Sequence, residues 1–262
     1  MQAFNYSSPT SLADAARAAG APDTRIIAGG QSLLPSMKLG LAAPAALVDL
    51  GGIAELRGIS RKGDAVVIGA MTTHAAVAAS PEVQKAIPAL AALAESIGDR
   101  QVRNRGTIGG SLADNDPAAD YPAAVLALGA TITTDRRTIA ADDFFKGLYE
   151  TALKEGEIIT SVSFPVPQKA GWQKFKQPAS RFSLVGVFVA KGAQGARVAV
   201  TGAGPCAFRA QALEQKLSAD WSAQACDGVK IDASGLNSDL HGSADYRAAL
   251  VPVLAGRAVA GS

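Results

Sequence analysis

The sequence predicts an α+β fold, in which helices and strands alternate through the first two thirds of the chain and an antiparallel hairpin follows. Short apolar runs of strand length recur between glycines and prolines. Alanine-rich stretches between them carry helix start and stop signals. With 262 residues, 48% hydrophobic and 18% charged, the chain is long enough for two or three small domains with substantial cores.

The N-terminal segment has the pattern of a β-α-β unit. A helix is predicted to begin at the Ser11-x-x-Asp14 cap and to end at Gly20. Apolar runs at 24–28 and 46–50 are predicted strands, and the first of them runs directly into a glycine-rich loop.

The middle segment continues the alternation. We expect a buried strand at 64–70, a helix at 88–98 that opens with proline, a helix around 121–129 and a strand at 130–134. The alternating sequence 157–167 is predicted to be an edge strand because it ends at prolines, and a domain boundary is placed there.

The C-terminal segment changes character. Residues 182–192 and 196–204 are predicted to form an antiparallel hairpin through a glycine-containing turn. Helical stretches are expected at 208–225 and 243–259.

Composition excludes several classes of protein. A net charge of +2 gives no electrostatic footprint for nucleic acid or an anionic membrane. There is no signal-peptide pattern and no apolar run of about eighteen residues, so we expect a cytoplasmic protein without a membrane span. Cys206, Cys226, His74 and His241 are too scattered for a zinc or iron–sulfur site. His74 is predicted to start a helix, and both cysteines to be packed apolar groups.

Two glycine-rich stretches are candidates for ligand binding: IIAGGQSLLPSMK at 26–38 and NRGTIGGSLADNDPAADYPA at 104–123. Glycine lets backbone N–H groups approach a ligand closely, and phosphate oxygens accept from such groups. Neither stretch is a P-loop or a GxGxxG motif, and each alone is more often an ordinary turn. Together, each with a hydroxyl residue beside its glycines, they predict a dinucleotide, with Asp120 accepting from a ribose hydroxyl.

Longer motifs carry a family resemblance. The sequences AGGQSLLPSMKLGLAAPAALVDL and IGDRQVRNRGTIGGSLADNDPAADYPAAVLALGA resemble the FAD-binding medium subunit of the molybdenum hydroxylases, the group of aerobic carbon monoxide dehydrogenase and xanthine dehydrogenase. The similarity continues through 143–165, 172–190 and 197–204, so it covers nearly the whole chain.

The resemblance implies a fold with three parts. An FAD-binding fold of the PCMH type, which is VAO-like, would comprise one subdomain at 1–55 and a second at 56–167. A C-terminal α/β domain of antiparallel sheet and helices, of the carbon monoxide dehydrogenase flavoprotein type, would follow at 168–262.

The resemblance also implies which residues hold FAD. The two glycine loops would hold the diphosphate, Asp114 and Asp120 would line the ribityl and adenosine side, Ile159 would lie near the adenine, and Lys176 (with Lys174 as the alternative) would reach the flavin. The full implied set is Ala28, Gly29, Gly30, Gln31, Ser32, Leu33, Ile97, Val102, Thr107, Gly109, Gly110, Ser111, Ala113, Asp114, Asp120, Ile159 and Lys176.

Two positions depart from the family pattern. Gln31 stands where many relatives have histidine, and since the loop has no histidine or cysteine we expect FAD to be bound non-covalently. Trp172 stands where tyrosine is common, at the outer edge of the site.

The function implied is that of an oxidoreductase subunit in a heterotrimer. Molybdopterin and [2Fe-2S] clusters are expected only on partner subunits, a large molybdopterin subunit and a small iron–sulfur subunit. Electrons would pass through FAD to an external acceptor such as NAD, a quinone or oxygen, with no catalytic side chain and no metal ligand in this chain. The alternatives are a free-standing FAD reductase or oxidase, and a non-redox nucleotide-binding or scaffold module.

Some of these residues have a purely structural alternative. The carboxylates of 114–120 are also suited to capping a helix, which is the preferred interpretation for Asp116. The two lysines fit a solvated strand face equally well. A solvated face also suits the basic cluster of Arg100, Arg103 and Arg105, with contact to an acidic partner subunit or second substrate as the alternative.

Overall fold

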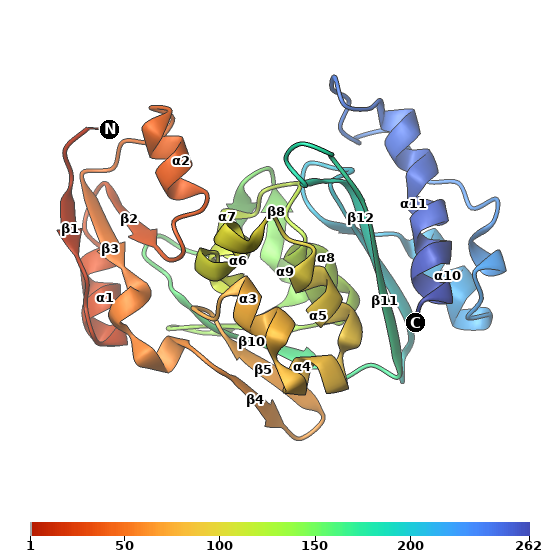
Figure 1. Ribbon diagram of the computed structural model, residues 1–262, viewed down its shortest axis with the longest axis horizontal. Coiled ribbons are helices and arrows are strands. Elements are labelled where there is room, and N and C mark those ends of the chain that lie inside the picture. Colours follow the sequence, from red (N-terminus) through yellow and green to blue (C-terminus); the bar gives the residue numbers. More distant parts are fainter. Residues whose placement is uncertain (1) are drawn as a thin grey trace.

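The computed structural model describes residues 2–262 as three sheet-based units that follow one another along the chain (Figure 1). The first is a small parallel sheet in the order β1-β3-β2, with α1 and α2 beside it. Ser11 caps α1 by accepting from the Asp14 N–H, and Gly20 follows its last residue, as the sequence predicts. The bounds are β1 (Asn5–Ser7), α1 (Leu12–Ala19), β2 (Thr24–Ile27), α2 (Leu33–Lys38) and β3 (Ala46–Asp49), followed by the short 3-10 helices η1 (Leu50–Gly52) and η2 (Ala54–Leu56).

The second unit is a five-stranded antiparallel sheet in the order β4-β5-β10-β6-β7. Helices α3, α4, α5, α7 and α8 pack with it to form the largest core. The strands are β4 (Ile59–Lys62), β5 (Ala65–Gly69), β6 (Thr131–Thr134), β7 (Thr138–Ala140) and β10 (Ile159–Pro165). The helices are α3 (His74–Ala79), α4 (Pro81–Ala86), α5 (Pro88–Glu95), α6 (Arg100–Arg105), α7 (Ile108–Asp114), α8 (Tyr121–Ala127) and α9 (Ala141–Phe144), and a hairpin of β8 (Phe145–Gly147) and β9 (Glu150–Thr151) follows.

The prediction that 157–167 forms an edge strand is wrong. β10 lies in the middle of the sheet, hydrogen-bonded to β5 on one side and β6 on the other. Its alternation arises because Val162 and Phe164 face the helical core while Ser161 and Ser163 face the opposite side. The prolines are tolerated because Pro165 is the last residue of the strand.

The third unit is an antiparallel sheet in the order β11-β12-β13-β14, covered by α10 and α11. The predicted hairpin is confirmed as β12 and β13, and the terminal helix as α11. The stretch 208–225 holds a shorter helix than predicted, because residues 208–209 form a strand. The bounds are β11 (Lys169–Lys176), β12 (Ser183–Gly192), β13 (Gly195–Thr201), β14 (Phe208–Arg209), α10 (Gln211–Ala219), η3 (Gln224–Cys226) and α11 (Ala244–Ala260).

The third sheet joins two cores. Phe188 and Ala199, on one face, belong to the core of the middle unit, whereas Val187 and Val198, on the other, pack under α10 and α11. The proposed boundaries after residues 55 and 167 fall between the three sheets. Within the described residues, no helix is both long and apolar enough to cross a membrane.

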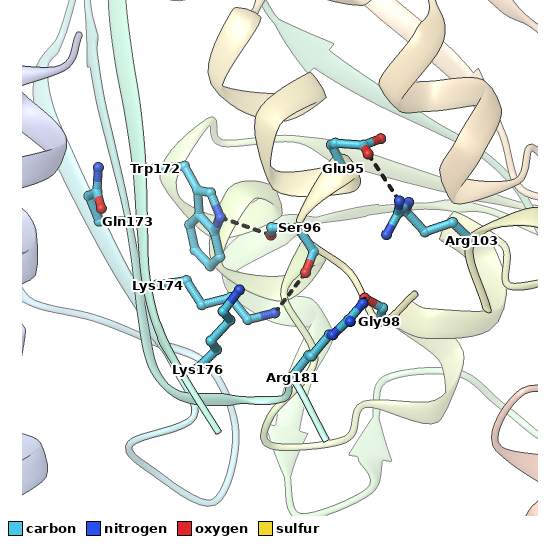
Figure 2. Close-up of a pocket in the computed structure, with 9 residues that line it drawn as sticks. All are labelled: Glu95, Ser96, Gly98, Arg103, Trp172, Gln173, Lys174, Lys176 and Arg181. Atoms are coloured by element: carbon cyan, nitrogen blue, oxygen red, sulfur yellow. Dashed lines mark hydrogen bonds and ion pairs between the residues drawn. The ribbon is translucent and has the colours of Figure 1, made fainter. Parts of the chain in front are cut away.

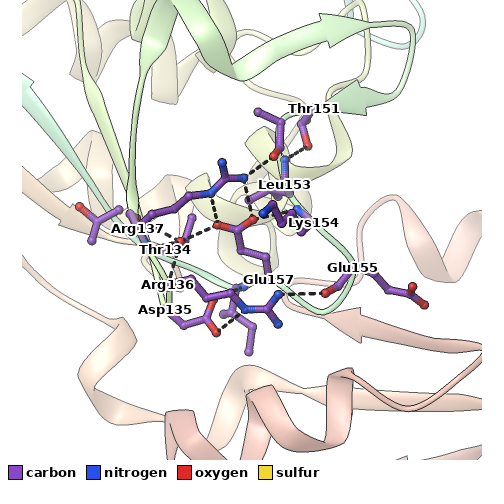
Figure 3. Close-up of polar contacts among 12 residues, drawn as sticks. Thr134, Asp135, Arg136, Arg137, Thr151, Leu153, Lys154, Glu155 and Glu157 are labelled. Carbon is purple, nitrogen blue, oxygen red and sulfur yellow. Dashed lines mark hydrogen bonds and ion pairs between the residues drawn. The ribbon is translucent and has the colours of Figure 1, made fainter.

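A buried carboxylate fixes the loop before β10 (Figure 3). Glu157 Oε1 accepts from Arg137 Nε at 2.9 Å and from Thr134 Oγ1 at 2.8 Å, and Oε2 accepts from the Lys154 N–H at 2.8 Å. The Glu157 side chain is 0% exposed. Because Arg137 and the other donors stabilise the ionised form, the pKa of Glu157 falls from its usual 4.5 to about 2.

We expect Glu157→Gln to lower the free energy of unfolding by up to about 3 kcal/mol at pH 7. The reason is that the folded state stabilises the ionised carboxylate, whose pKa is lower there than in the unfolded chain. The pKa is lower in the folded state, so this contribution is complete above about pH 4.5 and is lost as the pH falls toward 2. Urea denaturation at several pH values measures it. Glu155→Gln, at an exposed neighbour, is the control and should change stability little.

Candidate functional site

The two glycine loops, although more than seventy residues apart in sequence, lie against each other. A Cβ on Gly29 would clash with the carbonyl oxygen of Arg105, the residue two positions before the second loop. A Cβ on Gly110 would lie 3.5 Å from that of Ala28 and 2.9 Å from Thr107 Oγ1. The loops therefore meet backbone to backbone, at a distance that only glycine allows.

The first loop, 28–33, presents backbone donors. Gly30 has φ +72°, a left-handed conformation that favours glycine, and it turns the chain from β2 into α2. Within residues 2–262, the N–H groups of Gln31, Ser32 and Leu33 have no protein acceptor. Since Gln31 and Ser32 are exposed, these amides are available to an anionic ligand.

The second loop, 107–111, is instead braced by the protein. The Ile108 N–H donates to Thr72 O at 3.1 Å, and the Gly109 N–H to Ala70 O at 2.9 Å. Thr107 caps α7 by accepting from the Gly110 N–H at 3.1 Å. Thr107 is only 3% exposed, so the second loop presents mainly the half-buried Ser111 side chain.

The carboxylate of Asp114 links the loops at the end of α7. It lies near the Ser32 hydroxyl of the first loop, and partial burial raises its pKa while that hydroxyl opposes the rise. Ala113 beside it is exposed. Asp116 accepts from the Ala118 N–H at 2.8 Å, which makes it a turn-forming residue rather than a helix cap.

Asp120 lies at the junction with the third unit. Its Oδ2 accepts from Lys174 Nζ at 2.7 Å and its Oδ1 from Ser183 Oγ at 2.6 Å. The Lys174 and Asp120 side chains are only 5% and 4% exposed. Burial raises the pKa of Asp120, and the Lys174 charge and both hydrogen bonds lower it. A ribose hydroxyl at Asp120 would therefore have to share a carboxylate that already has two partners.

A pocket of about 480 Å³ opens beside this ion pair, between the middle and third units (Figure 2). Trp172 Nε1 donates to Ser96 Oγ at 3.2 Å, and Lys174 Nζ to Ser96 O at 3.3 Å, so both residues of β11 hold the end of α5. The residues that line the pocket are Glu95, Ser96, Gly98, Arg103, Trp172, Gln173, Lys174, Lys176 and Arg181.

The two lysines of β11 have different surroundings. Lys174 is buried in its ion pair, whereas Lys176 is exposed and has no hydrogen-bond partner among the described residues. The rim also contains Arg181, whose Nη1 donates to Gly98 O at 3.1 Å, and Arg103, which pairs with Glu95 at 3.0 Å. The pocket is thus more basic than acidic, and Lys176 is its available cation.

The remaining candidate residues are apolar and lie on two sides of the site. Ile97 stands between two lining residues of the pocket and packs against the main core, and Val102 contacts Gly98 closely enough to exclude a Cβ there. Ile159, the first residue of β10, is almost fully buried in the main core.

Sequence reasoning missed Ser183 and Arg181, because nothing local indicates that the chain after β11 returns to Asp120 and to the turn at Gly98. It also missed α6, whose Asp99 cap, which accepts from the Val102 N–H at 2.9 Å, was the available signal. Arg103 of the predicted basic cluster is paired, whereas Arg100 and Arg105 are exposed.

Comparison with known proteins identifies the family. Residues 2–167 match the model of the FAD binding domain in molybdopterin dehydrogenase, which covers more than half of the chain. The chain belongs to this family. Among its relatives, this chain is 38% identical to the carbon monoxide dehydrogenase medium chain of Hydrogenophaga pseudoflava, with 98% of this chain and 96% of that one covered. It is also 38% identical to the nicotine 6-hydroxylase medium subunit of Paenarthrobacter nicotinovorans, with 99% and 97% covered.

Solved structures agree with this family assignment. Carbon monoxide dehydrogenase from Hydrogenophaga pseudoflava superposes with a TM-score of 0.87 at 37% identity, over 98% of this chain and 96% of that one. Quinoline 2-oxidoreductase from Pseudomonas putida 86 gives 0.88 at 34% identity, over 99% and 96%. The chain is thus an FAD-binding medium subunit of the molybdenum hydroxylase type, with the predicted α+β fold. In residues 2–262, no group of three or more His, Cys, Asp and Glu side chains is placed to hold a metal ion.

We expect Lys174→Met to lower the free energy of unfolding by roughly 3–5 kcal/mol, because it leaves the Asp120 carboxylate buried without its counter-charge. Lys176→Met, on the same strand, should change stability by less than about 0.5 kcal/mol, since its side chain is exposed. Chemical denaturation of the two variants provides the comparison. Equal losses would contradict the assignment of the buried pair to Lys174.

Proposed function

We propose that this chain binds FAD non-covalently between its two glycine loops and the basic pocket, and carries electrons within a heterotrimeric molybdenum hydroxylase. The observation that carries the proposal is the backbone contact of Gly29 with Arg105, which places free amide donors beside a second, rigid loop. This arrangement occurs in a chain that matches FAD-binding medium subunits over nearly its whole length.

The residues present suit each part of the cofactor. The amides of Gln31 to Leu33 and the hydroxyl of Ser111 would hold the diphosphate, while Thr107 would brace the second loop as the cap of α7. Gly29, Gly110 and the small Ala28 let the two loops approach each other closely, so that both can face the same ligand. Ile97 and Lys176 would hold the flavin end, at the pocket.

The adenosine side is formed by the remaining candidates. Asp114 and Ala113 would line it at the end of α7, and Ile159 would support it from the core. Asp120 would contribute through its ion pair with Lys174, which fixes the pocket wall, as much as through any contact of its own. Val102 would keep the turn at Gly98 closed against the cofactor.

Bound FAD supplies the redox chemistry, since a flavin accepts and releases electrons singly or in pairs. The chain's own residues bind and orient it, and none of them needs to act as an acid or a base. We expect a small subunit with [2Fe-2S] clusters to deliver electrons and a large molybdopterin subunit to oxidise the substrate. An external acceptor then receives the electrons.

The proposed location is the cytoplasm. Cys206 and Cys226 are both free thiols, as is usual in a reducing compartment, and burial raises the pKa of each. The relatives act on different substrates, carbon monoxide, nicotine and quinoline among them according to their names, with the same medium-subunit fold. We therefore assign substrate choice to the large subunit.

The central test is replacement of Gly29 by alanine. Because the added Cβ would clash with the Arg105 carbonyl oxygen, we expect the loops to separate and the affinity for FAD to fall at least tenfold. Flavin absorbance after reconstitution and gel filtration measures the loss. Gly110→Val should act in the same direction by crowding Ala28 and Thr107.

Gly192→Ala is the matched control. A Cβ at Gly192 has no atom within 4 Å, so this variant should bind FAD as the wild type does. A wild-type chain that takes up no FAD would refute the proposed function. A Gly29→Ala chain with full flavin content would refute only the placement of the site.

A further inference from the structure

Residues 70–73 and the buried first residue of α3, His74, lie against the backbone of residues 106–109. Thr73 and Thr107 form an antiparallel bridge, with the His74 N–H donating to Gly106 O at 3.0 Å. The His74 side chain then lies directly under Gly106, so that a Cβ added to Gly106 would be 2.5 Å from His74 Nε2. His74 is 5% exposed.

The backbone of Gly106 does not itself require glycine. Its φ of −60° and ψ of 142° are open to any L-residue. The absence of a side chain at this position is therefore explained by the space that the imidazole takes, together with the Val102 carbonyl oxygen at 3.2 Å from the same Cβ position. The His74 imidazole thus occupies the space that a side chain at Gly106 would need.

The imidazole is neutral in this position. Burial first, and then the positive charge of Arg103 on α6, lower the pKa of His74 to about 4. On its other side the ring packs against Tyr121 of α8, with centroids 5.4 Å apart. Burial raises the pKa of Tyr121, so that side chain is neutral too.

Within residues 2–262, one polar atom of each side chain is buried without a protein partner. His74 Nδ1 and the Tyr121 hydroxyl are both buried without a hydrogen-bond partner among the described residues. Buried polar atoms without partners cost free energy, and at this position an apolar side chain would avoid that cost. The histidine is also wedged between the second loop and Tyr121, the neighbour of Asp120.

We propose that His74 is a positioning residue for FAD, whose imidazole seats Gly106 and thereby sets the height and direction of the loop 107–111 against the first loop. This inference rests on the proposed function, in which that loop holds the diphosphate. The first loop supplies the free amides, and His74 positions the loop 107–111 that faces them.

The test compares FAD affinity with fold stability in the complete chain, stripped of flavin and titrated again. We expect His74→Ala to raise the FAD dissociation constant at least tenfold. The matched control is Val77→Ala on the same helix, because Val77 is also fully buried but belongs to the apolar main core. It should lower the melting temperature as much or more while leaving the FAD dissociation constant within twofold of wild type.

A double-variant cycle keeps the proposal falsifiable if single variants are unstable. Gly106→Ala alone should weaken FAD binding by displacing the loop, whereas in the His74→Ala background the added methyl group has room, so the two losses should not multiply. His74→Gln, which keeps a polar end under Gly106, should recover part of the affinity. The flavin absorbance spectrum should shift in His74→Ala and return toward wild type in His74→Gln.

The outcomes separate the two proposals. Wild-type chain without FAD affinity would refute the proposed function. Normal FAD affinity in His74→Ala, equal weakening by Val77→Ala, or multiplying losses in the double variant would each refute the role of His74 while leaving the FAD site intact.

Discussion

The close approach of the Gly29 backbone to the Arg105 carbonyl is the constraint on which the site depends. It brings together a loop that leaves a parallel sheet and one that belongs to the helical cover of an antiparallel sheet. Two units with separate strands thus share one crossing point where no side chain fits. The direction in which the first loop presents its amides follows from that crossing.

The two glycine loops have similar sequences but different roles. In the first loop, the N–H groups of 31–33 have no acceptor within residues 2–262, whereas in the second the carbonyl groups of Thr72 and Ala70 accept from Ile108 and Gly109. A free amide is a binding group, but a loop made only of free amides has little to hold its shape. The protein combines a donor loop with a rigid counterpart.

Local signals in the sequence predicted local structure well. The Ser11 cap, the prolines that open helices and the glycine turn of the β12–β13 hairpin all act within a few residues, and the helices and strands they indicate are present. The position of β10 in its sheet was not predictable, because alternation reports which face is buried and not how many neighbours a strand has. The motifs indicated the two loops, but the use of their amides depends on residues 70–73, which neither motif contains. Lys174 and Lys176 looked equivalent, since only the fold reveals which of them meets Asp120.

The buried contact of Asp120 with Lys174 and Ser183 has a consequence for the history of the gene. One partner belongs to the segment that matches the family domain, and the other two come from β11 and β12 beyond it. Recombination at the boundary between these segments would combine Asp120 from one ancestor with β11 and β12 from another. If the second ancestor lacked the lysine or the serine, the Asp120 carboxylate would be buried without its partners. Inheritance of both segments as one block is therefore favoured, however readily the enzymes they serve diverge in substrate.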